Sequence, residues 1–432
     1  MNILAIETSC DDTCIAVIKA DKDKPQRGFT QIKFEILSNV VSSQVEIHKK
    51  YGGVYPTLAK REHQKNLVPV LIRALEGAKL LKISNIQFPI SKSRFHQGSW
   101  TSPGQITNNK QIPNYKLQIL KEILEREPTL LKNLTQFFEN YKKPNINAIA
   151  VTVGPGLEPC LWVGVNFAKA LSYFWNLPII PVNHIEGHIF ANFIDKSQIP
   201  NLKSQVFPAI CLVVSGGHTQ LILMKDIGKY RIIGETRDDA TGECFDKIAR
   251  ILGLGYPGGP AIAAEAAKFA EARPPRACGG LASAKLPRPM IYSKNYDFSF
   301  SGLKTAVLYD FKKRPPKIRN SKQYIQQMCE ETQQAIIDVL ILKTIKAAKF
   351  HKVKTILLGG GVAANQELKK QFKLIINTQL PTVNFLVPVK KLCTDNAAMI
   401  GITGSYYFLK KKHSCQNWKK IRAEANLKIS RT

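Results

Sequence analysis

The sequence predicts an α/β protein with a duplicated domain, and three glycine-containing or small polar turns between apolar segments support this prediction. Residues 2–18 (NILAIETSCDDTCIAVI) contain an apolar strand, a small polar turn and a second apolar strand. Residues 209–224 (AICLVVSGGHTQLILM) repeat this plan. Residues 354–368 (KTILLGGGVAANQEL) join a strand, Thr355–Leu358, to a helix expected near Ala363. Two matching hairpins predict two related domains whose hairpin tips face a shared cleft.

The first hairpin carries acidic residues in unusual places. Buried strand ends seldom hold unpaired acids, so Glu7 is expected either to cap the following turn or to hold a ligand. Asp11 and Asp12 follow in the turn, where Asp11 would position a magnesium ion or a water molecule. Small residues in both hairpin tips leave backbone N–H groups free to face an anion, although most glycine turns are merely turns.

Residues 184–188 (HIEGH) place two histidines four positions apart, which puts them on one face of a helix. Zinc proteases use H-E-x-x-H or its inverted form, and here Glu186 occupies neither position of the acid. The spacing therefore predicts a metal site without the general base of a peptidase. The best third ligand in the sequence is Asp395, and two histidines with one carboxylate suit iron(II) or zinc held for catalysis. Two cleft histidines without a metal are the alternative.

Residues 240–262 combine a helix with glycine turns. Phe245, Ile248, Ala249 and Leu252 recur at helical spacing, which leaves Asp246 at the polar flank. The sequence GGP at residues 258–260 is expected to break the helix and form a loop with free backbone. Lys304 is a candidate for neutralising a phosphate or an acid of the cleft, or a plain surface lysine. Further acids fall at turns or helix edges; they are Asp238, Asp239 and Glu243.

Three segments lack the pattern of the rest. Residues 83–116 are polar and interrupted by proline, and residues 272–290 are rich in proline, arginine, glycine and alanine. We interpret both as surface insertions, the second basic enough to contact RNA. Residues 410–432 predict a solvated basic extension.

The composition indicates a large excess of positive charge. The chain has 432 residues, enough for two domains, and 62 lysine and arginine residues against 32 acidic residues give a formal net charge of +30. An excess of this size indicates a polyanionic partner, because neutralising phosphates releases condensed counterions. A lysine-rich genome would produce the same bias without such a partner. The nine cysteines form no C-x-x-C pair, no apolar run is long enough to cross a bilayer, and no leader precedes the first strand, so we expect a reduced cytoplasmic protein.

Eight motifs occur in order between residue 3 and about residue 402: IETSCDDT, NHIEGH, VVSGGHT, DDATGECFDKIA, YPGGP, FSFSGLKTA, GGGVAAN and TDNAA. Together they closely resemble the tRNA N6-adenosine threonylcarbamoyltransferase family. The resemblance implies the actin/Hsp70/sugar-kinase (ASKHA) fold, with two actin-like α/β domains around a central cleft. It also implies transfer of the threonylcarbamoyl group from threonylcarbamoyl-AMP to the exocyclic amine of adenosine 37, in tRNAs that read codons beginning with adenine.

The resemblance also assigns site residues. It implies one divalent metal ion per chain, Fe(II) or else zinc, held by His184, His188 and Asp395. It implies that the adenylate contacts Val213, Val214, Ser215, Gly216, Gly217, Asp246, Gly259 and Asn365. Asp11 is our candidate for the residue beside the incoming amine, as orienter or base. Bacterial members commonly read D-E where this chain has Asp11 and Asp12, which shortens the reach of the second carboxylate.

The resemblance further implies domains and partners. We expect an N-terminal lobe at residues 1–205, completed by about 396–432, and a C-terminal lobe at residues 206–395. The expected partners are tRNA, threonylcarbamoyl-AMP and, in a bacterial setting, an inactive paralogue (TsaB) and a small ATPase (TsaE), with no membrane. Two other functions remain: a small-molecule kinase of the same fold, and a non-catalytic paralogue that binds RNA. Neither requires the histidine pair, and inactive paralogues typically lose it.

Overall fold

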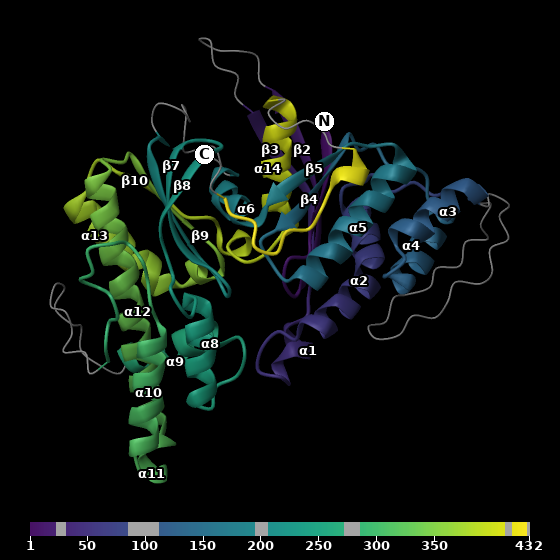
Figure 1. Ribbon diagram of the computed structural model, residues 1–432. Helices are drawn as coiled ribbons and strands as arrows, with labels where there is room; N and C mark the ends of the chain where they lie inside the picture. The colour runs from purple at the N-terminus through teal and green to yellow at the C-terminus, as the bar shows by residue number, and fades with distance from the viewer. Residues whose placement is uncertain (23–31, 85–111, 195–205, 272–285, 411–416, 430–432) are drawn as a thin grey trace.

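A computed structural model describes residues 1–22, 32–84, 112–194, 206–271, 286–410 and 417–429 (Figure 1). Two five-stranded mixed sheets form its framework. The first sheet has the order β3-β2-β1-β4-β5 and the second the order β10-β9-β6-β7-β8. The strands of the first are β1 (Asn2–Glu7), β2 (Asp12–Lys22), β3 (Ile32–Ser43), β4 (Ala148–Gly154) and β5 (Ile179–Asn183). Those of the second are β6 (Ala209–Val214), β7 (Thr219–Asp226), β8 (Lys229–Glu235), β9 (Thr355–Gly359) and β10 (Asn384–Leu386).

The two sheets have the same topology. In each, three consecutive strands form an antiparallel meander, one later strand pairs in parallel with the first strand of that meander, and another pairs in parallel with that later strand. The hairpin registers correspond, since Glu7 pairs with Cys14 and Val214 pairs with Thr219 at the two tips. The predicted duplication is therefore confirmed, and the architecture is that of two actin-like α/β lobes.

Helices cover both sheets. Those before residue 206 are α1 (Val45–Lys49), α2 (Pro56–Gly77), α3 (Asn114–Ile123), α4 (Pro128–Asn140), α5 (Glu158–Trp175), α6 (His184–Phe190) and the 3-10 turn η1 (Ala191–Phe193). Later α-helices are α8 (Thr241–Ile251), α9 (Gly258–Glu271), α10 (Ser301–Lys313), α11 (Pro316–Arg319), α12 (Lys322–Phe350), α13 (Gln366–Gln379) and α14 (Ala397–Lys410). The later 3-10 turns are η3 (Gly361–Ala364), η4 (Lys390–Leu392) and η5 (Trp418–Lys420).

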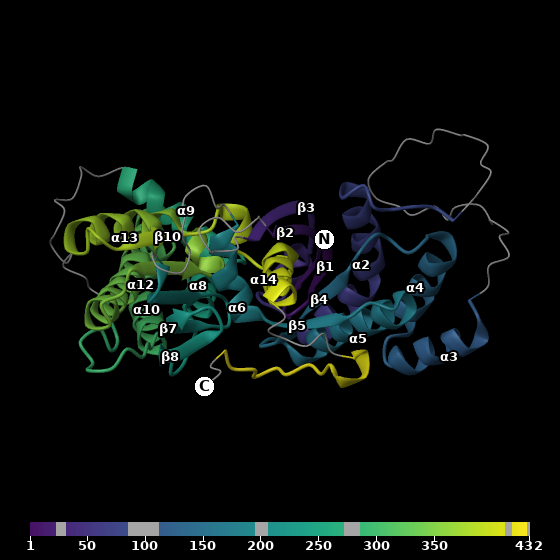
Figure 2. The same cartoon turned by 90° about the horizontal axis from the view of Figure 1, so that it is seen from above.

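The packing forms three apolar cores. The outer core of the first lobe lies between its sheet and α2 to α5, and that of the second lobe lies between its sheet and α8, α9, α10, α12 and α13. The third core joins the inner faces of both sheets through α6 and α14 (Figure 2). Because α6 and α14 lie between the lobes, residues at their N-terminal ends are brought into the space between the two hairpin tips.

Close packing requires glycine at two of the three positions at the end of β9, Gly359 and Gly360. Gly360 has φ +89°, and a Cβ there would collide with the backbone carbonyl of Val214 at the end of β6. The following helix begins later than we expected. Residues after Gly360 form η3, and α13 begins only after Asn365, whose side-chain oxygen accepts the Leu368 N–H at 3.0 Å. This N-cap, rather than the apolar pattern, determines where α13 begins.

The predicted loop at residues 258–260 is wrong, because α9 begins at Gly258. The Asp246 carboxylate of α8 accepts the Gly258 N–H at 2.6 Å and so satisfies one of the free N–H groups at this helix start. Pro260 is tolerated there because residues of the first turn need no intrahelical N–H bond. The preceding helix is as predicted, with Phe245, Ile248 and Ala249 buried in the core of the second lobe.

The C-terminal segment is also not the solvated extension we predicted, as far as residues 417–429 are described. Backbone bonds join it to the end of β4, with Glu424 N–H donating to Val153 at 2.7 Å and Ala425 accepting from Gly156. Trp418 contacts the Tyr173 ring, and Ile421 is buried. The backbone bonds join this segment to residues more than 260 positions earlier in the chain, so local composition could not indicate them.

The predicted insertions lie mostly outside the described residues. Residues 85–111 and 272–285 are not described, so contact of the second insertion with RNA stays a prediction. The first insertion is shorter than predicted at its C-terminal end, because α3 begins at Asn114. The expected lobe boundary at residues 205 and 206 likewise stays a prediction. None of the described helices is long and apolar enough to cross a membrane, and the cytoplasmic location is untested.

Candidate metal centre and substrate cleft

The two histidines of the HIEGH segment lie in the first turn and a half of α6, directly after β5. The side chain of Asn183 caps this helix, because its oxygen accepts the N–H groups of Ile185 at 2.9 Å and Glu186 at 3.2 Å. The helical spacing then points His184 and His188 in the same direction, with ring centroids 4.7 Å apart. Both rings are buried.

Asp395 approaches the histidine pair from the other end of the chain. Its Oδ1 lies 3.5 Å from His184 Nε2 and 3.3 Å from His188 Nε2. One ligand atom from each of the three residues lies within 4.8 Å of the others. Asn396 holds the segment in place, since its side-chain oxygen accepts the Met399 N–H at the start of α14. The structure therefore brings together the three residues predicted as metal ligands.

The donor set fits a divalent ion. His188 is fully buried, and neither of its ring nitrogens forms a well-directed hydrogen bond, although Asp395 is near. A buried imidazole without a hydrogen-bond partner is costly, and a metal ion bound to one nitrogen would remove part of that cost. Two imidazoles and one carboxylate, which leave other coordination positions open, are typical of catalytic iron(II) or zinc sites.

Glu7 orients the first histidine. Its Oε2 accepts from His184 Nδ1 at 2.9 Å and from the Thr152 hydroxyl at 2.6 Å, and its Oε1 accepts from the Ser9 N–H. The first alternative for this residue is confirmed, because Glu7 caps the turn, and direct contact with a ligand stays a prediction. A carboxylate on Nδ1 fixes the tautomer that leaves Nε2 free for a metal.

The charges of this cluster stabilise one another. Burial alone would raise the pKa of Glu7, but the charge of His184 and the hydrogen bond from it hold that pKa below its ordinary value. Burial would lower the pKa of His184, and the Glu7 and Asp395 carboxylates instead raise it to about 9. Burial likewise opposes the ionised form of Asp395, yet the two histidines keep its pKa well below the usual range. Three ionisable groups are therefore held in the cleft by mutual attraction.

Glu186 faces away from the metal cluster. Its carboxylate accepts a short hydrogen bond from the hydroxyl group of Tyr407 on α14. A glutamate held there cannot serve as the general base of a metal-bound water. The structure therefore agrees with the sequence argument that the histidine pair does not belong to a peptidase.

The two hairpin tips flank the metal cluster from opposite lobes. In the first tip, Ser9 Oγ lies 3.1 Å from His184 Nδ1. In the second tip, the Ser215 hydroxyl accepts the His218 N–H at 3.1 Å and closes a compact turn. Burial, with His184 and His188 nearby, lowers the pKa of His218 to about 4, so this imidazole is neutral at physiological pH. The predicted shared cleft would lie between these tips, and it stays a prediction.

Residues expected to contact the adenylate gather around the second tip. A Cβ built on Gly216, Gly217 or Gly259 would meet no atom within 4 Å, so the backbone there borders open space. Gly259 lies in the first turn of α9, and Asp246 reaches that turn through its bond to Gly258. Val213 and Val214 are fully buried residues of β6, so their contact with the adenylate stays a prediction. Asn365 donates to Gln333 at 2.7 Å while it caps α13.

The acids of the first tip lie within reach of the same cleft. Burial raises the pKa of Asp11, and Asp395 adds to that increase. Burial likewise raises the pKa of Asp12 to about 7, and its buried Oδ1 has no hydrogen-bond partner. The role of Asp11 at the amine stays a prediction. Asp12 is a second candidate proton acceptor, although the sequence indicated no specific role for it.

The other acidic residues noted in the sequence have structural partners. Asp238 caps α10, where it accepts from the N–H of Phe300 at 2.8 Å and from the hydroxyl of Ser301 at 2.7 Å. Asp239 pairs with Lys247 at 2.6 Å and with Lys304 at 3.6 Å. Glu243 pairs with the same lysine of α8 at 2.8 Å. Lys304 therefore pairs with an acid of the second lobe, and its suggested roles at a phosphate or at an acid of the cleft stay predictions.

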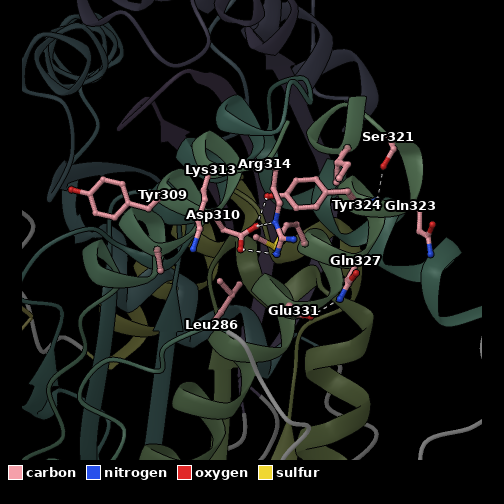
Figure 3. A pocket seen from close by; sticks show the side chains of 13 residues that line it. Leu286, Tyr309, Asp310, Lys313, Arg314, Ser321, Gln323, Tyr324, Gln327 and Glu331 are labelled. Atoms are coloured by element: carbon pink, nitrogen blue, oxygen red, sulfur yellow. Dashed lines mark hydrogen bonds and ion pairs between the residues drawn. The ribbon is translucent and has the colours of Figure 1, made fainter. Parts of the chain in front are cut away.

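The sequence did not indicate the supporting residues Ser9, Thr152 and Asn183. Each acts through a hydrogen bond that only the folded chain creates. A separate pocket in the second lobe lies between α10 and α12 (Figure 3) and contains none of the predicted site residues. In that pocket Asp310 accepts from the Tyr324 hydroxyl at 2.9 Å and pairs with Arg314 at 3.1 Å.

Comparisons with known proteins agree with this geometry. Residues 35–87 and 125–402 match the family described as TsaD, tRNA N6-adenosine threonylcarbamoyltransferase. The chain belongs to this family. The Syntrophomonas wolfei tRNA N6-adenosine threonylcarbamoyltransferase is 39% identical, over 94% of this chain and 92% of that protein. The protein of the same name from Thermosipho africanus is 39% identical over 99% and 100% of the two chains. The Bacillus subtilis protein of that name is 38% identical over 95% and 91%.

Proposed function

We propose that this chain transfers the threonylcarbamoyl group of threonylcarbamoyl-AMP to the N6 amine of adenosine 37 in tRNAs that read codons beginning with adenine. Membership of the threonylcarbamoyltransferase family supports the reaction class. The cluster of His184, His188 and Asp395 between the two hairpin tips is the observation that carries the proposal, because the chemistry of a small-molecule kinase does not require this histidine pair. The excess of positive charge agrees with an RNA substrate.

In this reaction the amine nitrogen attacks the carbamoyl carbon, the carbon–oxygen bond to the phosphate breaks, and AMP leaves. The cleft residues would hold donor and acceptor in line, which removes most of the entropic part of the barrier. Backbone groups at Gly216, Gly217 and Gly259 border open space and would bind the adenylate there. Asp246, at the start of α9, would contact the ribose, and the remaining N–H of the Asn365 amide is available to the nucleotide.

Asp11 would orient the amine and take up the proton that it loses. Its raised pKa supports this role, because a base whose pKa lies nearer to the working pH is more effective. His184, His188 and Asp395 would hold one divalent ion, iron(II) or else zinc, which when bound supplies Lewis acidity for charge on the donor. Glu7 keeps the His184 ring in the orientation required for that site.

We further propose that the chain acts with bacterial-type partners, an inactive paralogue (TsaB) and the ATPase TsaE. The full-length similarity to proteins from Bacillus subtilis and Thermosipho africanus supports a bacterial-type setting.

The experiment combines the purified chain, its partner proteins, threonylcarbamoyl-AMP and unmodified tRNA with a suitable anticodon, followed by mass spectrometry of the digested nucleosides. The expected result is threonylcarbamoyladenosine with the wild-type chain and none with a His184→Ala, His188→Ala variant that keeps its circular dichroism spectrum. A matched control is Glu186→Gln, because this residue does not face the metal cluster. Formation of the product at the wild-type rate by the double variant would contradict the proposed site.

A further inference from the structure

One loop of the first lobe touches the second lobe beside the cleft. This loop, residues 50–55, joins α1 to α2 and lies opposite α8 (Figure 1). The guanidinium of Arg250 on α8 donates a short hydrogen bond to the Gly52 carbonyl. Gly52 has φ +65°, and a Cβ there would lie 3.1 Å from Arg250 Nε, so both the backbone and the contact favour glycine. A second approach between the lobes lies beside this loop, because a Cβ on Gly255 would lie 4.0 Å from Lys49 Cε.

The loop is also held in place on its buried side. His48 is fully buried, its Nδ1 accepts the Tyr55 N–H at 3.3 Å, and its Nε2 lies 3.1 Å from the side-chain oxygen of Gln44. Backbone bonds from Tyr51 and Gly52 to the end of α1 complete the turn. The residues on its outer side are therefore held in place rather than free to move with the loop.

Two tyrosines stand on the outer side of this supported loop. Tyr51 is 63% exposed and Tyr55 is 56% exposed. Their rings are stacked, with centroids 5.9 Å apart and an angle of 24° between the ring planes. Two nearly parallel aromatic rings, exposed to solvent and fixed by a buried histidine, form a flat platform to which another planar group can add.

The platform lies at the entrance of the predicted substrate cleft. Arg250, which contacts this loop, is one helical turn after Asp246 on α8, a residue expected to contact the adenylate. Cationic side chains belong to the same segments, since Lys49 and Lys50 directly precede Tyr51 and Arg250 contacts the Gly52 carbonyl, and all three are exposed. Aromatic faces combined with lysine and arginine are typical of surfaces that bind single-stranded nucleic acid.

We propose that Tyr51 and Tyr55 form a stacking platform for an unpaired base of the RNA substrate, a neighbour of the base that receives the acyl group. This inference rests on the proposed function. An enzyme that acts on the edge of a base in an RNA loop must take that base out of its stack, and its neighbours then lose a stacking partner. Tyr51 and Tyr55 replace that partner, while Lys50 and Arg250 neutralise the adjoining phosphates.

The test uses the metal-loaded chain with its partner proteins and an unmodified anticodon stem-loop RNA in which a fluorescent base analogue replaces a neighbour of the target base. Binding to wild type should quench the analogue, as stacking does. A Tyr51→Ala, Tyr55→Ala variant should lose the quenching and bind the RNA roughly 5- to 150-fold more weakly, the range expected for loss of one stacked base. A Tyr51→Phe, Tyr55→Phe variant keeps the rings and should stay within about twofold of wild type.

A matched control is Tyr292→Ala, which removes a tyrosine that is 77% exposed and belongs to the second lobe. This variant should bind RNA as wild type does. Thermal melting of each variant shows whether the fold is kept, which we expect because all three tyrosines are largely exposed. Zinc affinity measured on the same samples should be unchanged, since none of these side chains belongs to the metal cluster.

Three results would overturn the platform. If the alanine variant kept the wild-type RNA affinity and the wild-type KM for the RNA, no base would stack there. Equal loss in the phenylalanine variant would show that the hydroxyl groups, rather than the rings, matter. Unchanged RNA binding with loss of a partner protein from the complex would identify a protein interface instead. RNA binding is measured without turnover, so a chain that binds RNA through the tyrosines but forms no modified nucleoside would refute only the proposed function.

Discussion

Replacement of Glu7 by glutamine tests how much the orientation of His184 contributes to metal binding. The substitution keeps the shape of the side chain but removes its charge. Glu7 accepts three hydrogen bonds, from His184, Thr152 and the Ser9 N–H. Glutamine has one acceptor oxygen and one donor amide group, so at least one of these donors would face another donor.

The expected loss follows from these contacts. A hydrogen bond to a charged group is worth about 1.5–3 kcal/mol and a neutral one about 0.5–1.5 kcal/mol, so loss of the charge weakens the bond from His184 by about 1–2 kcal/mol. That difference corresponds to about a 5- to 30-fold loss of metal affinity. Because the glutamine amide donor is also misplaced, we expect a loss of metal affinity toward the upper end of that range. Such a loss lies within the roughly 10- to 100-fold range typical of residues that orient a metal-binding histidine.

The assay is competition for zinc against a fluorescent chelator, because zinc is not oxidised during the measurement. A Thr152→Val variant is the matched control, since it removes one donor to Glu7 but keeps the Glu7 charge that faces His184. Its zinc affinity should fall no more than about threefold. Glu7→Gln protein that keeps its fold and binds zinc within threefold of wild type would refute the orienting role.

Three other predictions concern stability and the role of Glu186. Asp12→Asn should raise the melting temperature by an amount that grows between about pH 4 and pH 7 and reaches at most about 4 °C. The folded protein favours the protonated Asp12 carboxyl, so the stability of the wild-type fold falls as the pH rises toward the folded pKa of about 7, whereas asparagine does not ionise. A difference in melting temperature that does not change with pH in calorimetry would exclude this. Gly360→Ala should destabilise the fold by about 2 kcal/mol or more, whereas Gly361→Ala, whose Cβ would lie 4.0 Å from the nearest atom, should be nearly neutral in urea titrations. Glu186→Gln should keep zinc affinity within about twofold, and a tenfold loss would place this carboxylate at the metal after all.

The sequence predicted those parts of the molecule that depend on local pattern. The two hairpins, the helix with His184 and His188 on one face, and the helix containing Phe245 and Ile248 all follow from periodicity and turn residues, and all are confirmed. The duplicated pattern also predicted that the two tips face one another.

The errors fall where a distant residue decides the local structure. A glycine pair before a proline predicts a loop, yet Gly258 begins a helix because Asp246 accepts its N–H. The residues around Ile421 are polar enough to predict a free tail, yet they pair with the backbone after β4. The hydrogen bonds of Glu7 with Thr152 and His184 cross 145 and 177 residues of sequence, so no local pattern contains them.

The most direct test of the account is a titration of metal-free protein with iron(II) under anaerobic conditions, with threonylcarbamoyladenosine formation measured at each point in the presence of partner proteins, tRNA and threonylcarbamoyl-AMP. The account predicts that product formation rises in proportion to bound iron, reaches its maximum at one ion per chain, and is absent in an Asp395→Ala variant that keeps its fold. Full activity in metal-free protein, or in that variant, would contradict a catalytic metal centre formed by His184, His188 and Asp395.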